Sequence, residues 1–132
     1  MADTKRILAV DDEPDCLEFV KAILELEGFD IITAHNGEEG LKKAIDEHPD
    51  LIILDVQMPK KDGFRVFHEI KQDEKTKDIP VVMLTGIRDK VGMGFSVQEM
   101  EEFMGARPAE YIEKPIDPNK LKEAVKKIFK ME

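Results

Sequence analysis

The stretch LIILDVQMPKKDG, residues 51–63, joins four consecutive apolar residues to a carboxylate, Asp55, with a proline and a turn close behind. A continuous apolar run of this kind is typical of a strand that is buried on both faces, as in parallel sheets. A charged group at the edge of an apolar layer is unfavourable unless other groups compensate for it. The groups that compensate for Asp55 must therefore come from elsewhere in the chain.

Similar apolar runs recur along the sequence and alternate with helical patterns. Strands separated by helices in this way form a parallel sheet that helices cover on both faces. We therefore predict an α/β protein with a doubly wound, five-stranded parallel sheet. The predicted strands cover residues 7–10, 31–34, 51–54, 81–84 and 111–112, and helical spacing is found over 14–28, 41–45, 63–71 and 121–129, with one more helix starting at Ser96.

Composition narrows the class of protein. The 132 residues fit one compact domain, so we predict a single domain over residues 1–132 with no output domain. The net charge of -9 argues against direct nucleic-acid binding, and no apolar run approaches the ~18 residues of a membrane span. One cysteine, Cys16, suits a reducing compartment, and its place in a helical apolar pattern predicts a buried, inert thiol. We expect a cytoplasmic protein.

Reactive side chains follow four of the predicted strands. Asp11 and Asp12 follow the first strand, Asp55 the third, Thr85 the fourth, and Lys114 comes shortly after the fifth. In doubly wound folds, ligands bind outside the C-terminal ends of the strands, so these groups are expected to meet. Two carboxylates about 4 Å apart repel by roughly 4 kcal/mol at an effective dielectric near 20, so a cation is required. Hard oxygen ligands in a partly open site favour Mg²⁺.

The combination predicts phosphoryl transfer. A carboxylate can accept the phosphoryl group, while a divalent ion, an ammonium group and a hydroxyl donor neutralise and bind its oxygens. Each residue also has an ordinary explanation. Asp11 and Asp12 could cap the helix that Pro14 starts, Thr85 could be a loop threonine, and Lys114 a surface lysine. Their coincidence at one edge of the sheet favours the functional interpretation.

Four motifs resemble those of a known family. AVDDEP, LIILDVQMPKKDG, VVMLTG and YIEKP are similar to the motifs of the receiver domain of two-component response regulators, in the same order and over nearly the whole chain. Among these, the chain resembles the single-domain, chemotaxis-regulator-like members. It implies a flavodoxin-like receiver fold and a phosphoacceptor switch in a phosphorelay. Asp55 would take a phosphoryl group from a sensor histidine kinase or phosphotransfer protein, and an unidentified downstream protein would recognise the phosphorylated form.

The resemblance also implies the metal ligands. Asp12 and Asp55 would bind Mg²⁺ directly, and the backbone carbonyl of Gln57 would be a further ligand. Asp11 would act on the metal through a water molecule.

The resemblance assigns the switch residues as well. Thr85 would donate a hydrogen bond to the phosphoryl group, and Lys114 would pair with it. Tyr111 matches the aromatic switch position, whose ring turns inward when the threonine moves. The peptide bond between Lys114 and Pro115 is expected to be cis.

The segment between Thr85 and Lys114 is longer than is usual in the family. Ser96 and Glu99 form a capping box that starts a helix at Ser96, with Gly105 as its stop. Residues 86–95 are then a long loop beside the site, either a functional cover or partner surface or a tolerated insertion. The family's output face would comprise this helix, the last strand and the final helix.

Three functional classes remain at this stage. A receiver switch would act on itself only, by accepting phosphate and losing it to water, and would not be an enzyme with an external substrate. A haloacid-dehalogenase-type phosphohydrolase needs an aspartate two residues after its nucleophile, where this chain has Gln57. The third class is a receiver-shaped interaction module that acts without phosphorylation.

Overall fold

The computed structural model describes residues 4–56, 63–85 and 108–130, which form a parallel five-stranded sheet in the order β2-β1-β3-β4-β5. The predicted α/β class and strand positions are confirmed. The strands are β1 (Arg6–Val10), β2 (Asp30–Ala34), β3 (Leu51–Asp55), β4 (Val81–Thr85) and β5 (Glu110–Glu113). The helices within these ranges are α1 (Pro14–Leu26), α2 (Gly37–Glu47), α3 (Gly63–Gln72) and α6 (Pro118–Ile128).

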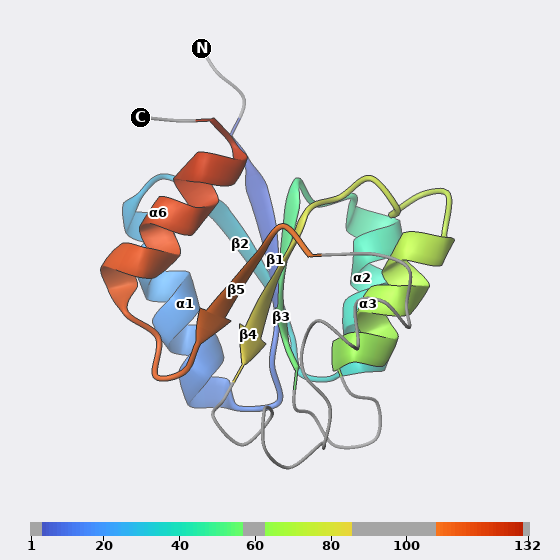
Figure 1. Ribbon diagram of the computed structural model, residues 1–132, viewed down its shortest axis with the longest axis horizontal. Helices are drawn as coiled ribbons and strands as arrows, with labels where there is room; N and C mark the ends of the chain where they lie inside the picture. The colour runs from blue at the N-terminus through green and yellow to red at the C-terminus, as the bar shows by residue number, and fades with distance from the viewer. Residues whose placement is uncertain (1–3, 57–62, 86–107, 131–132) are drawn as a thin grey trace.

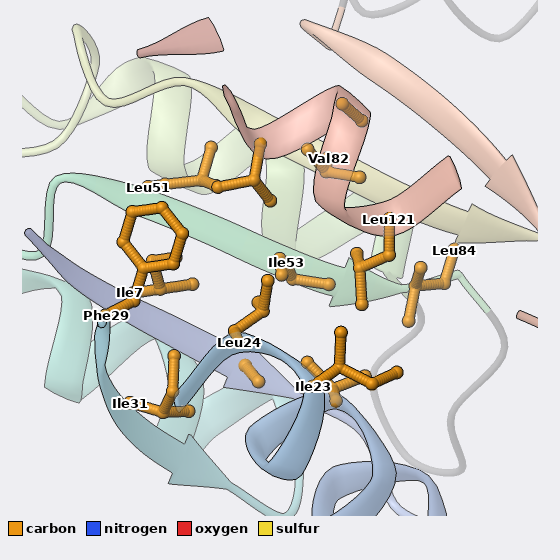
Figure 2. Packing of buried hydrophobic residues seen from close by; sticks show 14 of the residues in the cluster. Ile7, Ile23, Leu24, Phe29, Ile31, Leu51, Ile53, Val82, Leu84 and Leu121 are labelled. Carbon is orange, nitrogen blue, oxygen red and sulfur yellow. The ribbon is translucent and has the colours of Figure 1, made fainter. Parts of the chain in front are cut away.

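Helices cover both faces of the sheet. Figure 1 shows the sheet nearly edge-on, with α1 and α6 on one side and α2 and α3 on the other. Because successive strand residues point to opposite faces, each apolar strand supplies two separate cores. In Figure 2, side chains of α1 and α6 point toward those of β1, β2, β3 and β4. This explains why β3 and β4 are buried along their whole length rather than alternating buried and exposed residues.

Local signals set the helix ends. Pro14 lies in the first turn of α1, and Gly28, just beyond the helix, has φ +92°, which favours glycine. The Asn36 side chain caps α2 by accepting a hydrogen bond from the backbone of Glu39. Asp117 caps α6 in the same way. The start and end of α1 were therefore predicted from Pro14 and Gly28, whereas the capping roles of Asn36 and Asp117 were not predicted.

Helix α2 differs from its predicted packing. Leu41, Ala44 and Ile45 were expected to form its core stripe, but only Ala44 is fully buried, while Leu41 and Ile45 are half-buried. The helix approaches β1 through Gly40 instead. A Cβ atom at Gly40 would lie 2.8 Å from a methyl group of Val10, so the glycine allows the close contact.

Within the described ranges, no helix is long and apolar enough to cross a membrane. The predicted loop at residues 86–95, the capping box at Ser96 and the helix stop at Gly105 lie outside these ranges.

Candidate functional site

The strand register brings the predicted site residues to one edge of the sheet. Val10 pairs with Leu54, so the next residues of β1 and β3, Asp11 and Asp55, lie at the same level. The strands point toward the lower end of Figure 1, where this edge lies.

β4 and β5 complete the edge. Thr85 pairs with Glu113, and the backbone N–H of Lys114 donates a 2.7 Å hydrogen bond to the Thr85 carbonyl. The register thus places Thr85 and Lys114 beside the aspartates that follow β1 and end β3.

Three carboxylates gather at this edge. One oxygen from each of Asp11, Asp12 and Asp55 lies within 4.8 Å of the others. Asp11 and Asp55 are only 1% and 2% exposed, whereas Asp12 is more open to solvent. Burial and the negative charge of Asp11 raise the pKa of Asp12. The convergence expected from sequence is therefore present, and it produces the repulsion that a cation would relieve.

Lys114 supplies one positive charge to this cluster. Its Nζ lies 3.1 Å from Asp11 Oδ2 and 3.2 Å from Asp55 Oδ1. Burial alone would lower the pKa of Lys114, but the carboxylates of Asp55 and Asp11 outweigh it and raise the pKa, so the ammonium stays protonated. One ammonium does not neutralise three carboxylates, and the cluster keeps a net negative charge.

The donor set fits Mg²⁺. Carboxylate oxygens are hard ligands, and a site with one or two buried carboxylates and an open side suits an ion that retains water. Asp12 lies on the solvent-accessible side of the site, whereas Asp11 and Asp55 are buried on its inner side. The fourth expected ligand, the Gln57 carbonyl, lies outside the described residues.

Thr85 and Tyr111 lie on the face of the sheet that α2 and α3 cover. Thr85 lies two residues after Met83 in β4, so the two side chains point to the same face of the sheet. Tyr111 pairs with Met83 in the neighbouring strand β5 and points to that face as well. Thr85 is 2% exposed, and Tyr111 is half-buried against the core that α2 and α3 cover. The two side chains are thus diagonal neighbours on adjacent strands, within the reach of an aromatic ring. Their switch role stays a prediction.

Two residues at the site escaped the sequence analysis. Gly63 was placed at the end of the 51–63 motif and at the start of a helix but was given no role at the site, yet a Cβ there would collide with the Asp55 carbonyl oxygen. Its N–H also donates a 2.7 Å hydrogen bond to Val56, so this glycine fixes the backbone next to Asp55. Glu13, whose Oε1 lies 3.7 Å from Lys114 Nζ, was not singled out either. The third consecutive acidic residue in Asp11-Asp12-Glu13 was the available signal.

One further expectation is confirmed by the structure, and a second is met only in part. The peptide bond between Lys114 and Pro115 is cis. Cys16 is partly rather than fully buried, and burial together with the Asp11 carboxylate raises the pKa of its thiol to about 12. A thiol with this pKa is almost entirely protonated at neutral pH, which agrees with the predicted inertness.

The fold and the carboxyl-edge cluster define a class of doubly wound proteins in which an aspartate lies beside a lysine and two further carboxylates at the carboxyl edge of the sheet. The sequence matches the family described as the response regulator receiver domain over residues 7–126. The chain therefore belongs to the receiver domains of two-component response regulators.

Individual relatives agree with this assignment. The chain is 38% identical over 128 residues to the alkaline phosphatase synthesis transcriptional regulatory protein PhoP of Bacillus subtilis, covering 96% of this chain and 49% of that protein. It spans about half the length of the curated relatives it matches. Among solved structures, it resembles a putative response regulator from Chloroflexus aurantiacus, with a TM-score of 0.82, 30% identity, and coverage of 97% and 99% of the two chains. The corresponding values for the chemotaxis protein CheY4 of Vibrio cholerae are 0.80, 28%, 96% and 99%.

Proposed function

We propose that Asp55 is the phosphoacceptor of this receiver domain. The observation that carries the proposal is its position, buried at the carboxyl edge with Lys114 3.2 Å away and the oxygens of Asp11 and Asp12 alongside. The donor is a phosphohistidine of a sensor histidine kinase or phosphotransfer protein, and a downstream protein recognises the phosphorylated form. This assignment uses the pairing of a buried carboxylate with a cation that acyl-phosphate formation needs.

The transfer is a substitution at phosphorus. A carboxylate oxygen of Asp55 forms the new P–O bond while the P–N bond to the donor histidine breaks, and the imidazole leaves. Lys114 pairs with an oxygen of the transferred group, replacing part of its present contact with Asp55. Asp12 and Asp55 would hold Mg²⁺, with the Gln57 carbonyl as a further expected ligand and Asp11 acting through a water molecule. When bound, this ion neutralises charge on the phosphoryl oxygens.

The switch depends on Thr85 and Tyr111. The Thr85 hydroxyl donates a hydrogen bond to a phosphoryl oxygen, which moves the end of β4 toward the site. Tyr111 is the diagonal neighbour of Thr85 on the same face, so its ring turns into the space that the threonine leaves. Phosphorylation would thus favour one of two conformations, and partner proteins would bind that conformation more tightly.

The proposal also includes where the domain acts and how it loses its phosphoryl group. The domain acts only on itself, accepting the phosphoryl group and losing it to water, and has no external substrate. It works in the cytoplasm and does not itself contact nucleic acid or a membrane. The net charge of -9 supports this, because phosphate contacts need a basic face.

The test is the intact mass of the protein after incubation with acetyl phosphate and Mg²⁺. The expected result is gain of one phosphoryl group, lost in Asp55→Asn and lost when a chelator removes the metal. Asp46→Asn, which makes the same change at an exposed position on α2, serves as the matched control and should be phosphorylated normally.

Gain of a phosphoryl group by Asp55→Asn would contradict the assignment of the acceptor. No gain in the wild type with either acetyl phosphate or a phosphorylated histidine donor would instead favour an interaction module that acts without phosphorylation.

A further inference from the structure

Glu13 has an unusual place at the start of α1. It occupies the N-cap position, where a side-chain oxygen normally accepts a hydrogen bond from the first turn, but its side chain makes no such bond. Both backbone groups of Glu13 are hydrogen-bonded. The N–H donates a 3.0 Å hydrogen bond to Asp11 Oδ1, and the carbonyl accepts hydrogen bonds from the backbone N–H groups of Cys16 and Leu17. The carboxylate instead lies 3.7 Å from Lys114 Nζ.

This contact changes the entrance to the site. Lys114 faces the buried carboxylates of Asp11 and Asp55 and, on its outer side, a third carboxylate that is 67% exposed. An incoming phosphoryl group must therefore pass an exposed negative charge and displace it from the lysine with which it pairs. Both effects oppose a small donor, and both grow with the negative charge of that donor.

We propose that Glu13 is a specificity-determining residue that disfavours small, highly charged phosphodonors at Asp55. The inference rests on the proposed phosphoacceptor function of Asp55. Glu13 is outside the proposed reaction itself, because the three carboxylates that could hold the ion are Asp11, Asp12 and Asp55. Its effect is on which donors reach the acceptor and how fast.

The experiment compares the wild type with Glu13→Gln at saturating Mg²⁺ and low ionic strength, measuring the initial rate of phosphorylation. Two donors are used: acetyl phosphate, a dianion at neutral pH, and phosphoramidate, whose protonated nitrogen leaves it with less net negative charge. Removal of one charge should speed the reaction with acetyl phosphate about three- to tenfold, with a smaller gain for phosphoramidate. The gain should fall below about twofold near 1 M salt, where charges more than about 3 Å apart are screened.

Two control variants separate local from general effects. Glu18→Gln removes the same charge from another exposed position of α1 and should change the rate less than about twofold. Glu13→Ser removes the charge while supplying a standard capping hydroxyl, and it should reproduce the Glu13→Gln result.

The outcomes are distinguishable. Equal acetyl phosphate rates in the wild type and both Glu13 variants, or an equal gain in Glu18→Gln, would overturn the role of Glu13 and leave Asp55 as the acceptor. A wild-type protein that is phosphorylated neither by these two donors nor by a phosphorylated histidine donor would overturn the proposed function, and the role of Glu13 with it.

Discussion

Two clusters of one cation with several carboxylates lie at opposite ends of the same sheet. At the carboxyl edge, Lys114 contacts Asp11 and Asp55, and the side chains are 23%, 2% and 3% exposed. At the amino edge, Arg6 contacts Asp30 at 3.2 Å and Glu47 at 3.4 Å, with exposures of 43%, 52% and 46%. We call these the Lys114 cluster and the Arg6 cluster.

The difference between them is burial rather than composition. Exposed ion pairs contribute about 0–1 kcal/mol because water screens them, whereas breaking a buried pair costs about 3–5 kcal/mol. The Arg6 cluster therefore joins β1, β2 and α2 only weakly. The Lys114 cluster holds more negative than positive charge away from water, an arrangement that opposes folding and is explained by the chemistry it supports.

The largest expected effect comes from replacing the cation of each cluster by alanine. Lys114→Ala leaves Asp11 and Asp55 buried without their ammonium, so we expect the free energy of unfolding to fall by about 3 kcal/mol in the absence of Mg²⁺. Arg6→Ala should lower it by less than about 1 kcal/mol. Urea unfolding measures both. Equal losses would show that burial does not separate the two clusters.

A smaller effect of opposite sign is expected at Asp55. Asp55→Asn removes one of three mutually repelling carboxylates while Lys114 keeps Asp11, so metal-free stability should rise by about 1 kcal/mol. In the Arg6 cluster the same change, Asp30→Asn, should lower stability slightly, because only an attraction is lost.

Mg²⁺ provides the second half of this comparison. At a concentration about 100 times its dissociation constant, it should stabilise the wild type by about 2.7 kcal/mol, and Asp55→Asn by clearly less. Thermal unfolding with and without Mg²⁺ measures both proteins. Equal stabilisation of the two would remove Asp55 from the proposed ligands.

The fold was largely predictable because its signals are local. The central strands contain continuous apolar runs such as residues 51–54, and the structure moves the predicted strand boundaries by no more than one residue at either end. Pro14 marks the start of α1 by its own chemistry, whereas the Asn36 cap of α2 was not predicted. The packing of α2 was not predictable from hydrophobicity, since the contact with Val10 is made by Gly40, a residue without a side chain.

The site divides in the same way. The meeting of Asp11, Asp12 and Asp55 follows from strand order and the rule that parallel strands share a carboxyl edge. The contacts of Gly63 with the Asp55 carbonyl and of Glu13 with Lys114 depend on how loops return to that edge. Loop geometry of this kind is set by tertiary packing, and no periodicity in the sequence encodes it.

The smallest expected effect concerns an ion pair of intermediate exposure. Glu39, 34% exposed, accepts a 2.8 Å hydrogen bond from the backbone of His35 and lies 3.1 Å from Lys43. These contacts, of which the hydrogen bond has the largest effect, lower the pKa of Glu39 below its usual 4.5.

The pH dependence of stability follows from this shift. Because the pKa of Glu39 is lower in the folded state, the stabilisation is full above pH 4.5 and is lost as the pH falls through the folded pKa. Glu39→Gln should therefore cost about 0.5 kcal/mol at pH 7, and the difference from the wild type should shrink below pH 4.5 in urea unfolding series. Glu25→Gln, at an exposed position on α1, is the control. If the difference in free energy of unfolding between the wild type and Glu39→Gln stayed constant with pH, the loss would come from packing rather than from charge. The strength of these ion pairs would then not follow their burial.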